Sequence, residues 1–324
     1  MRKLVAIIAV TSGVGLIVLP IATSLFARAA AGERVTDRFR ATMSVAGLRA
    51  LKTNFGTMGA ALDQFISEAS PQLADQLKLS ANRFNAFERH HFPATAAAVA
   101  QLPPLIKYVS PVAAELETLH PEFASVDSLP LLGLPLTTVP WILVGLGVVL
   151  AGLGIVVVRS RGRGPLVVAC VLGAGMLIVP LALSYPSKTS DARKIADVGN
   201  VALSQQAATG ARTANGLIDG MVTEVHDSVI PTLAHQLGTS PAALTATIAS
   251  NYPKLAAGLA AWPTIKPGAV KLAAVQQASV HDAARMKGLD FSPLPWYIIG
   301  PGIALLIASG IALTTSGRSR PETA

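Results

Sequence analysis

Four long apolar runs without a charged residue constrain this chain more than any other feature of its sequence. They occupy residues 4–26, 139–158, 165–183 and 295–315. Each run approaches or exceeds the roughly 20 residues that an α-helix needs to cross about 30 Å of hydrocarbon. Only 14% of the 324 residues are charged, against about 25% in a typical soluble protein. The sequence therefore predicts an all-α integral membrane protein with four transmembrane helices.

Basic residues indicate how these helices cross the membrane, because arginine and lysine are retained on the cytoplasmic side. They precede the first run, fill the link between the second and third, and follow the fourth: Arg2, Lys3, Arg159, Arg161, Arg163, Arg318 and Arg320. The sequence therefore predicts that both termini lie inside. The net charge of +8 is then mostly a signal of topology, and we do not expect nucleic acid as a partner.

This topology divides the chain into eight segments. The transmembrane helices are expected at 1–26, 139–158, 165–183 and 295–315, the extracytoplasmic domains at 27–138 and 184–294, the cytoplasmic link at 159–164 and the cytoplasmic tail at 316–324. Ala27-Arg28-Ala29 has the spacing of a signal-peptidase site, so cleavage after the first run is the competing interpretation. That run is longer than the usual 7 to 15 or so apolar residues of a signal peptide, which favours an uncleaved helix.

The two halves of the chain resemble each other at an offset of 160 residues. Residues 71–103 align with 231–263 without a gap, and 12 of the 33 positions are identical. Further on, Pro140-Trp141 matches Pro295-Trp296 at an offset of 155. Each half therefore reads as a membrane helix, an outer domain and a returning helix. Because two helices make an even number, both copies enter the membrane in the same direction, which predicts parallel repeats related by an axis along the membrane normal.

Apolar residues in the first outer domain alternate steps of three and four, a pattern typical of a helix seam that faces a partner helix. The seam consists of Leu48, Leu51, Phe55, Met58, Leu62 and Phe65. The second copy keeps part of the pattern at Ile218, Val222, Val225 and Val229. The seam either packs within its own domain or pairs with the other copy or another chain.

Prolines and serines at equivalent positions predict where the outer helices begin and end. Pro71 and Pro231 are expected to stop the seam helix. Ser80 and Ser240 are candidate N-caps of the next helix, which should end before the prolines at 93 and 253. An Ala-rich helix should then run to the prolines at 103 and 263. Each outer domain is thus expected to be a bundle of four or five helices.

Small residues at spacing four in the apolar runs are typical of helix faces that pack closely in a membrane. These rows are Gly147 with Ala151, Ala169 with Gly173, and Gly300 with Ala304, Ala308 and Ala312. They are expected to hold the four helices together, with contact to another membrane protein as the alternative. Trp141, Trp296 and Tyr297 fall where the returning helices meet the outer membrane surface, and we interpret them as interface anchors.

Residues with catalytic or metal-binding chemistry are sparse. The single cysteine, Cys170, lies within the third run, so the outer domains form no disulfide. His90 and His91 point about 100° apart on a helix and are poorly placed to bind one metal ion. No Walker loop, HExxH, GxSxG or dinucleotide motif occurs. We therefore expect neither an enzyme nor a bound cofactor or metal.

Three functional hypotheses remain. The leading one is a membrane scaffold or accessory subunit that binds another envelope component through its outer domains and small-residue faces; a homo-oligomer is left open. The alternative is binding of lipid or another apolar ligand between outer helices, lined by Phe84, Phe87, Phe92, Leu244 and Tyr252. The third is a sensor that relays through a partner. The Ala-rich, Lys-poor composition is typical of a GC-rich bacterial genome, so the expected location is the bacterial plasma membrane.

Overall fold

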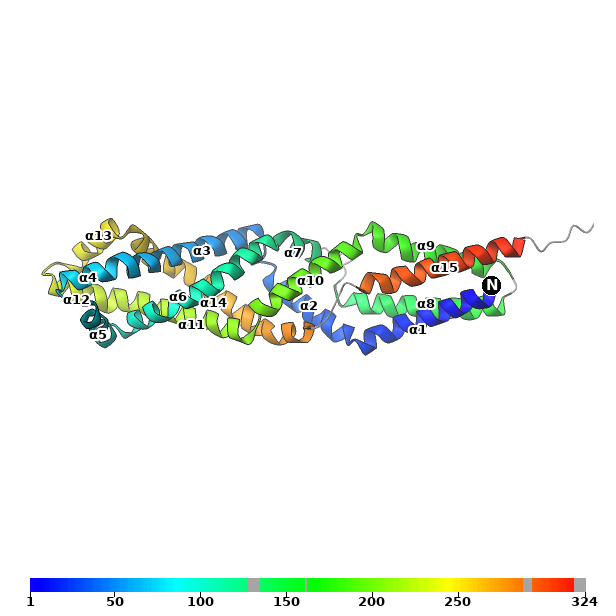
Figure 1. The fold of residues 1–324 in the computed structure, drawn as a ribbon, viewed down its shortest axis with the longest axis horizontal. Helices are drawn as coiled ribbons and strands as arrows, with labels where there is room; N and C mark the ends of the chain where they lie inside the picture. The colour runs from blue at the N-terminus through cyan, green and yellow to red at the C-terminus, as the bar shows by residue number, and fades with distance from the viewer. Residues whose placement is uncertain (128–134, 161, 288–292, 318–324) are drawn as a thin grey trace, which may run out of the picture. The chain divides into compact units, whose positions relative to one another are not determined.

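The computed structural model describes residues 1–127, 135–160, 162–287 and 293–317, and every regular element within them is helical (Figure 1). The basic residues Arg161, Arg318 and Arg320 of the predicted topology lie outside the described part. Two compact units are present. The spanning unit comprises Met1–Asp37, Pro121–Asp197 and His281–Ala324, and the bundle unit comprises Arg38–His120 and Val198–Val280.

The spanning unit contains the four predicted membrane helices. They are α1 (Arg2–Ala22), α8 (Thr138–Arg159), α9 (Gly164–Ala182) and α15 (Leu294–Gly317). All four are long and apolar enough to cross a membrane, as the sequence predicts. Helices α2 (Leu25–Phe39) and α10 (Tyr185–Ala202) also begin in this unit, and α7 (His120–Asp127) lies in it from Pro121 onward.

The first membrane helix ends four residues earlier than the sequence predicts. Ser24 adopts a left-handed conformation with φ of 53°, and Ser184 does the same after α9. A left-handed residue breaks the regular hydrogen-bond ladder of a right-handed helix. Leu25 and Phe26, which belong to the apolar run, therefore start the separate helix α2.

The membrane helices form two tight pairs, α1 with α8 and α9 with α15 (Figure 1). A Cβ atom on Gly13 of α1 would lie 2.6 Å from the backbone oxygen of Gly147 in α8. A Cβ atom on Gly173 of α9 would lie 2.9 Å from the backbone oxygen of Gly302 in α15. Both distances are too short for a real side-chain atom, so the close approach of each pair depends on glycine.

The bundle unit is built from two successions of helices. The first consists of α3 (Val45–Gln64), the π-helical turn η1 (Phe65–Ala69), α4 (Ser70–Gln76), α5 (Ala81–His91) and α6 (Pro93–Thr118). The second consists of α11 (Gln205–Glu224), the π-helical turn η3 (Val225–Val229), α12 (Ile230–Gln236), α13 (Pro241–Asn251) and α14 (Pro253–Met286).

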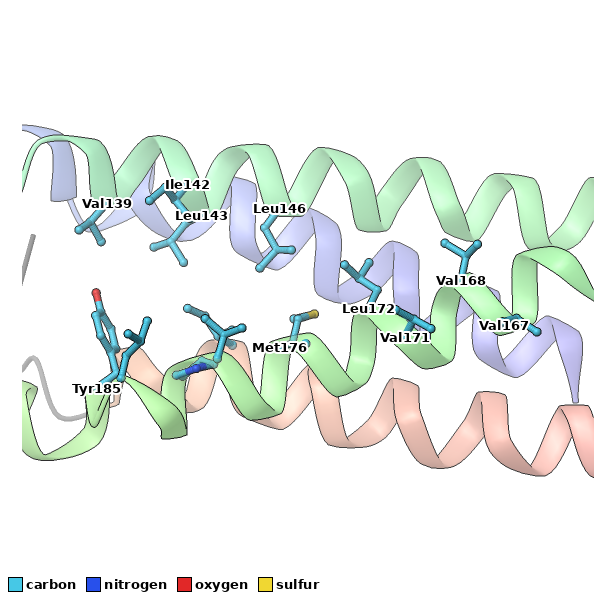
Figure 2. A pocket seen from close by; sticks show the side chains of 15 residues that line it. Val139, Ile142, Leu143, Leu146, Val167, Val168, Val171, Leu172, Met176 and Tyr185 are labelled. Carbon is cyan, nitrogen blue, oxygen red and sulfur yellow. The ribbon is translucent and has the colours of Figure 1, made fainter. Parts of the chain in front are cut away.

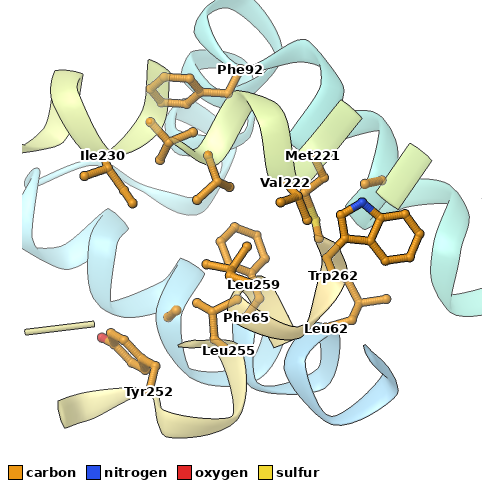
Figure 3. Close-up of a cluster of buried hydrophobic side chains, with 14 of the residues drawn as sticks. Leu62, Phe65, Phe92, Met221, Val222, Ile230, Tyr252, Leu255, Leu259 and Trp262 are labelled. Carbon is orange, nitrogen blue, oxygen red and sulfur yellow. The ribbon is translucent and has the colours of Figure 1, made fainter. Parts of the chain in front are cut away.

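Both successions contribute to a single hydrophobic cluster, which differs from the two separate outer bundles that the sequence leads us to expect. Leu62 and Phe65 come from the first succession, and Met221, Val222 and Trp262 come from the second (Figure 3). All five side chains are buried. Burial of aliphatic and aromatic surface is the main favourable term in folding, so the core of the bundle unit depends on both segments of the chain.

The prolines at 71 and 231 do not stop the seam helix. The chain stays helical through η1 and η3, and each proline occupies one of the first two positions of the next helix, α4 or α12. Proline lacks an N–H group and clashes with the preceding turn of a regular α-helix. The wider π-helical turn before each proline accommodates both effects.

The later prolines are also accommodated, because α6 continues to Thr118 and α14 to Met286. The predicted helix ends at 103 and 263 are therefore wrong. The predicted starts are confirmed: Ser80 and Ser240 are the N-cap residues of α5 and α13, although only Ser240 accepts a side-chain hydrogen bond, from the Ala243 backbone N–H at 3.2 Å.

Candidate functional site

An apolar groove of about 540 Å³ lies between α8 and α9 in the spanning unit (Figure 2). Leu143 and Leu146 point into it from α8, and Leu172 and Met176 lie on the opposite wall. Ile298 of α15 also lines it. The remaining lining residues are Val139, Ile142, Val167, Val168, Val171, Gly175, Val179, Pro180, Leu183 and Tyr185.

The groove arises because α8 and α9 diverge from their short connection. The lining residues of α8 fall within its first half, from Val139 to Leu146, whereas α9 contributes along its length, from Val167 to Pro180. Figure 2 shows the two helices wide apart at the Val139 end. The tight pairs α1–α8 and α9–α15 meet more extensively through α1 and α15 than through α8 and α9. One side of the four-helix assembly is consequently open.

The walls of the groove differ chemically from the helix contacts within the tight pairs. Valine, leucine, isoleucine and methionine dominate the lining, and Gly175 is its one glycine. A Cβ atom on Gly175 would meet nothing within 4 Å, so this glycine does not serve a close helix contact. The groove can therefore hold an apolar, flexible molecule.

An aromatic side chain with a hydroxyl group, Tyr185, lines the wide end of the groove. The Tyr185 hydroxyl points toward Val139 (Figure 2), and burial raises the pKa of this phenol. A molecule in the groove would thus have apolar surroundings along its length and one phenol hydroxyl at this end.

The predicted interface anchors are exposed in the structure. Trp141, Trp296 and Tyr297 have 65%, 59% and 45% of their surface accessible. Trp141 contacts Phe26 edge to face, with 5.0 Å between ring centroids. Exposed aromatic rings at the ends of apolar helices suit a membrane surface, where rings with one polar and one apolar part prefer to lie.

The predicted small-residue rows divide into two groups. Gly147, Ala151 and Gly173 lie at the close contacts of the tight pairs. Ala169, Ala308 and Ala312 are buried in the hydrophobic cluster of the spanning unit. In contrast, Gly300 is exposed and Ala304 is only partly buried.

Three glycines at the close contacts, Gly13, Gly154 and Gly302, are absent from the sequence prediction. Gly154 and Gly302 have no small neighbour at a spacing of four, whereas Gly13 follows Ala9 at that spacing. The internal repeat holds a signal for two of them, because an offset of 160 aligns Gly13 with Gly173 and an offset of 155 aligns Gly147 with Gly302.

The seam residues are only partly internal. Leu48, Met58, Leu62 and Phe65 are buried, Leu51 is half-buried, and Phe55 is 39% exposed. Met58, Leu62 and Phe65 belong to the cluster shared with the second succession of helices. Four of the five side chains suggested for an outer lipid groove, Phe84, Phe92, Leu244 and Tyr252, are buried, and Phe87 packs against the core.

Two polar side chains that the sequence does not single out connect the halves of the bundle unit. Gln64 Oε1 accepts hydrogen bonds from the backbone N–H groups of residues 254 and 255, at 2.8 and 3.0 Å, at the start of α14. Glu224 accepts from the backbone N–H groups of residues 94 and 95, at 3.2 and 2.6 Å, at the start of α6. Each half thus satisfies otherwise unpaired N–H groups of a helix in the other half.

Comparison of the chain with protein-family models, curated proteins and solved structures finds no match. Among the described residues there is also no cluster of three or more histidine, cysteine, aspartate or glutamate side chains placed to hold a metal ion. The groove between α8 and α9 is the candidate functional site of the spanning unit.

Proposed function

We propose that this protein is a multi-pass membrane protein that binds an acyl chain of a membrane lipid in the groove between α8 and α9, without catalysing a reaction. The observation that carries the proposal is the groove itself, about 540 Å³ in volume and lined by apolar side chains. Binding sites for small ligands commonly occupy about 300 to 1,000 Å³. In a bilayer a groove that opens toward hydrocarbon is filled by lipid.

We further propose that the chain is a tandem parallel repeat with both termini on the cytoplasmic side. Recurring element bounds support the repeat: α3 and α11, α4 and α12, and α5 and α13 begin and end exactly 160 residues apart. Equivalent glycines at the contacts of α1–α8 and α9–α15 support it independently. The basic residues at the ends of the apolar runs support the orientation.

The two halves of the repeat differ at one helix interface in a way that favours a bound ligand. In a two-fold arrangement α8 corresponds to α15 and α9 to α1, so the α8–α9 and α15–α1 interfaces should be alike. Helices α15 and α1 contact each other more extensively than α8 and α9, and a groove lies between α8 and α9. Side chains lining an unfilled groove lose dispersion contacts on one side. An additional molecule at the open interface would restore those contacts.

An acyl chain suits the groove better than a helix of another protein. Helices in membranes pack through small residues that bring their backbones together, as Gly13 and Gly147 do in this chain. The groove walls instead carry branched side chains such as Val168 and Leu172. A flexible hydrocarbon chain can follow such walls, and the polar part of the lipid would lie near Tyr185.

The first prediction is that filling the groove expels lipid. A phenylalanine replacing Gly175 would enter the groove without meeting another backbone, because nothing lies within 4 Å of its Cβ position. We expect Gly175→Phe to lose most of the lipid that the wild-type protein retains after gentle extraction and washing. Native mass spectrometry of the full-length protein would count the bound lipids.

Gly152→Phe is the matched control, because Gly152 is exposed on α8, outside the groove, and its Cβ position is also open. It should retain lipid as the wild-type protein does. Equal lipid retention by the two variants would contradict lipid binding in the groove.

An accessory subunit of an envelope membrane complex is the second candidate function. Gly145 and Gly152 are exposed, lie two helical turns apart on one face of α8, and have open Cβ positions. Glycines at such positions would let a helix of another membrane protein approach closely. A protein partner that is lost from Gly152→Phe but kept by Gly175→Phe would favour this candidate over lipid binding.

A further inference from the structure

At two places in the bundle unit, a side chain of one half accepts hydrogen bonds from the backbone N–H groups that begin a helix of the other half. The two arrangements are alike, but the accepting groups differ chemically. At the start of α6 the acceptor is the Glu224 carboxylate, and the neighbouring helix α5 carries Glu88, which is only 6% exposed. At the start of α14 the acceptor is the neutral Gln64 amide. The residue of α13 that corresponds to Glu88, 160 positions later, is Ile248.

The corner at which α5 ends and α6 begins, called the α5–α6 corner below, also contains a buried hydroxyl group. The Thr95 side chain is 1% exposed, and its Oγ1 has no hydrogen-bond partner, while its backbone N–H donates to Glu224 at 2.6 Å. The corresponding residue in the other corner is Leu255. The start of α14 is thus capped by a neutral amide, whereas the start of α6 has the half-buried Glu224 carboxylate, the buried Glu88 carboxyl group and a buried hydroxyl beside it.

We propose that Glu88, Glu224 and Thr95 form a proton-sensitive latch that fastens the α5–α6 corner of the first half to α11 of the second half. The latch is firm when Glu88 carries a proton and loosens when Glu88 ionises beside Glu224. The equivalent corner at α13–α14, with Ile248 and Leu255, has no such dependence.

Charged groups near Glu88 do not offset its ionisation. Burial is the main factor that raises the pKa of Glu88, and repulsion from Glu224 raises it further. On α5 itself, Arg89, His90 and His91 are exposed to solvent. Asp75, on the adjacent helix α4, is exposed as well and would repel rather than stabilise an ionised Glu88.

The direction of the pH effect follows from linkage between proton binding and stability. The pKa of Glu88 is higher in the folded protein than the ordinary value of 4.5, so the folded state binds this proton more tightly than the unfolded state. The stabilising effect is therefore complete below pH 4.5 and is lost as the pH rises through the folded-state pKa. Acid tightens the corner, and neutral or alkaline solution loosens it.

Amide hydrogen exchange of the full-length protein in lipid nanodiscs tests this second prediction. After correction for the intrinsic pH dependence of exchange, peptides from 81–95 should be better protected at about pH 5 than at about pH 8, by up to about tenfold for each unit of pKa shift. Peptides from 241–255 serve as the control within the same molecule, and their protection should change little.

Substitutions of Glu88 and Glu224 distinguish loss of the proton-sensitive latch from a general loss of stability. Glu88→Gln and Glu88→Ile should abolish the difference between the two corners, the second by installing the residue found at position 248. Glu224→Gln keeps a cap like that of Gln64 and removes the repulsion, so it should shrink the difference. An equal pH response of both corners in the wild-type protein, or an unchanged response in Glu88→Gln, would overturn the proposal.

Discussion

At the scale of single residues, glycine determines how closely the membrane helices pack. The backbone of α8 approaches Gly13 so closely that a Cβ atom there would lie 2.6 Å from both Gly147 O and Ala151 N. Gly15, two residues further along α1, is exposed, and its Cβ position is open. The same helix therefore contains one glycine that the packing requires and one that it does not.

The third prediction compares these two glycines. Gly13→Ala should force α1 away from α8 and destabilise the protein by about 1 to 3 kcal/mol, the usual cost of overpacking a well-packed contact. Gly15→Ala should be neutral or slightly stabilising, because alanine favours the helix over glycine. Unfolding of both variants in mixed detergent micelles measures the difference. Equal stabilities would show that the α1–α8 contact can shift to admit a methyl group.

Sequence spacing predicts some of these residues and misses others for a physical reason. A row of small residues shows that one face of a helix would let another backbone approach closely. It does not show whether that face contacts another helix. Gly147 and Gly173 lie at close helix contacts, whereas Gly300 of the longest row is exposed. Gly302, which has no small neighbour at a spacing of four, becomes recognisable only when the halves are aligned.

At the scale of helices, the ends are set by polar groups as well as by prolines. The sequence predicts the starts of α5 and α13 at Ser80 and Ser240 because serine caps a helix locally. The start of α14 is capped instead by Gln64, which is about 190 residues away in the chain. No local pattern in the sequence can indicate such a cap.

The fourth prediction removes this long-range cap. Gln64 is 6% exposed and accepts two backbone hydrogen bonds, so Gln64→Ala leaves buried N–H groups at the start of α14 unpaired. We expect a loss of stability of about 1 to 3 kcal/mol and faster amide exchange in the first turn of α14. Gln76→Ala, at an exposed position of α4, is the control and should change neither. Unchanged exchange at residues 254 and 255 in Gln64→Ala would contradict the role of the cap.

At the scale of the whole molecule, sequence comparison reveals that the halves are alike but not how they associate. Equivalent residues at an offset of 160 are compatible with two separate outer bundles or with one shared bundle. The contacts favour sharing, since Tyr252 donates to Gln72 Oε1 at 2.6 Å across the halves. In the spanning unit, Arg34 pairs with Asp282 in the same way. Pairing between halves depends on side-chain fit over large sequence distances, which periodicity does not encode.

The fifth prediction follows from this interdependence. A chain cut in the link at Gly162 would yield one half with Gln64 and the start of α6, and another with Glu224 and the start of α14. Each half alone lacks the cap for its own helix and half of the shared core. We therefore expect each half expressed alone to be degraded or to self-associate, and the two halves expressed together to co-purify and resist protease as the intact chain does. Exposed apolar surface of the size of a shared core is not compatible with a stable monomer. A protease-resistant, monomeric half with ordered α3 to α6 would show instead that each half carries a complete core, and the hydrogen bonds between halves would then be contacts between two finished domains.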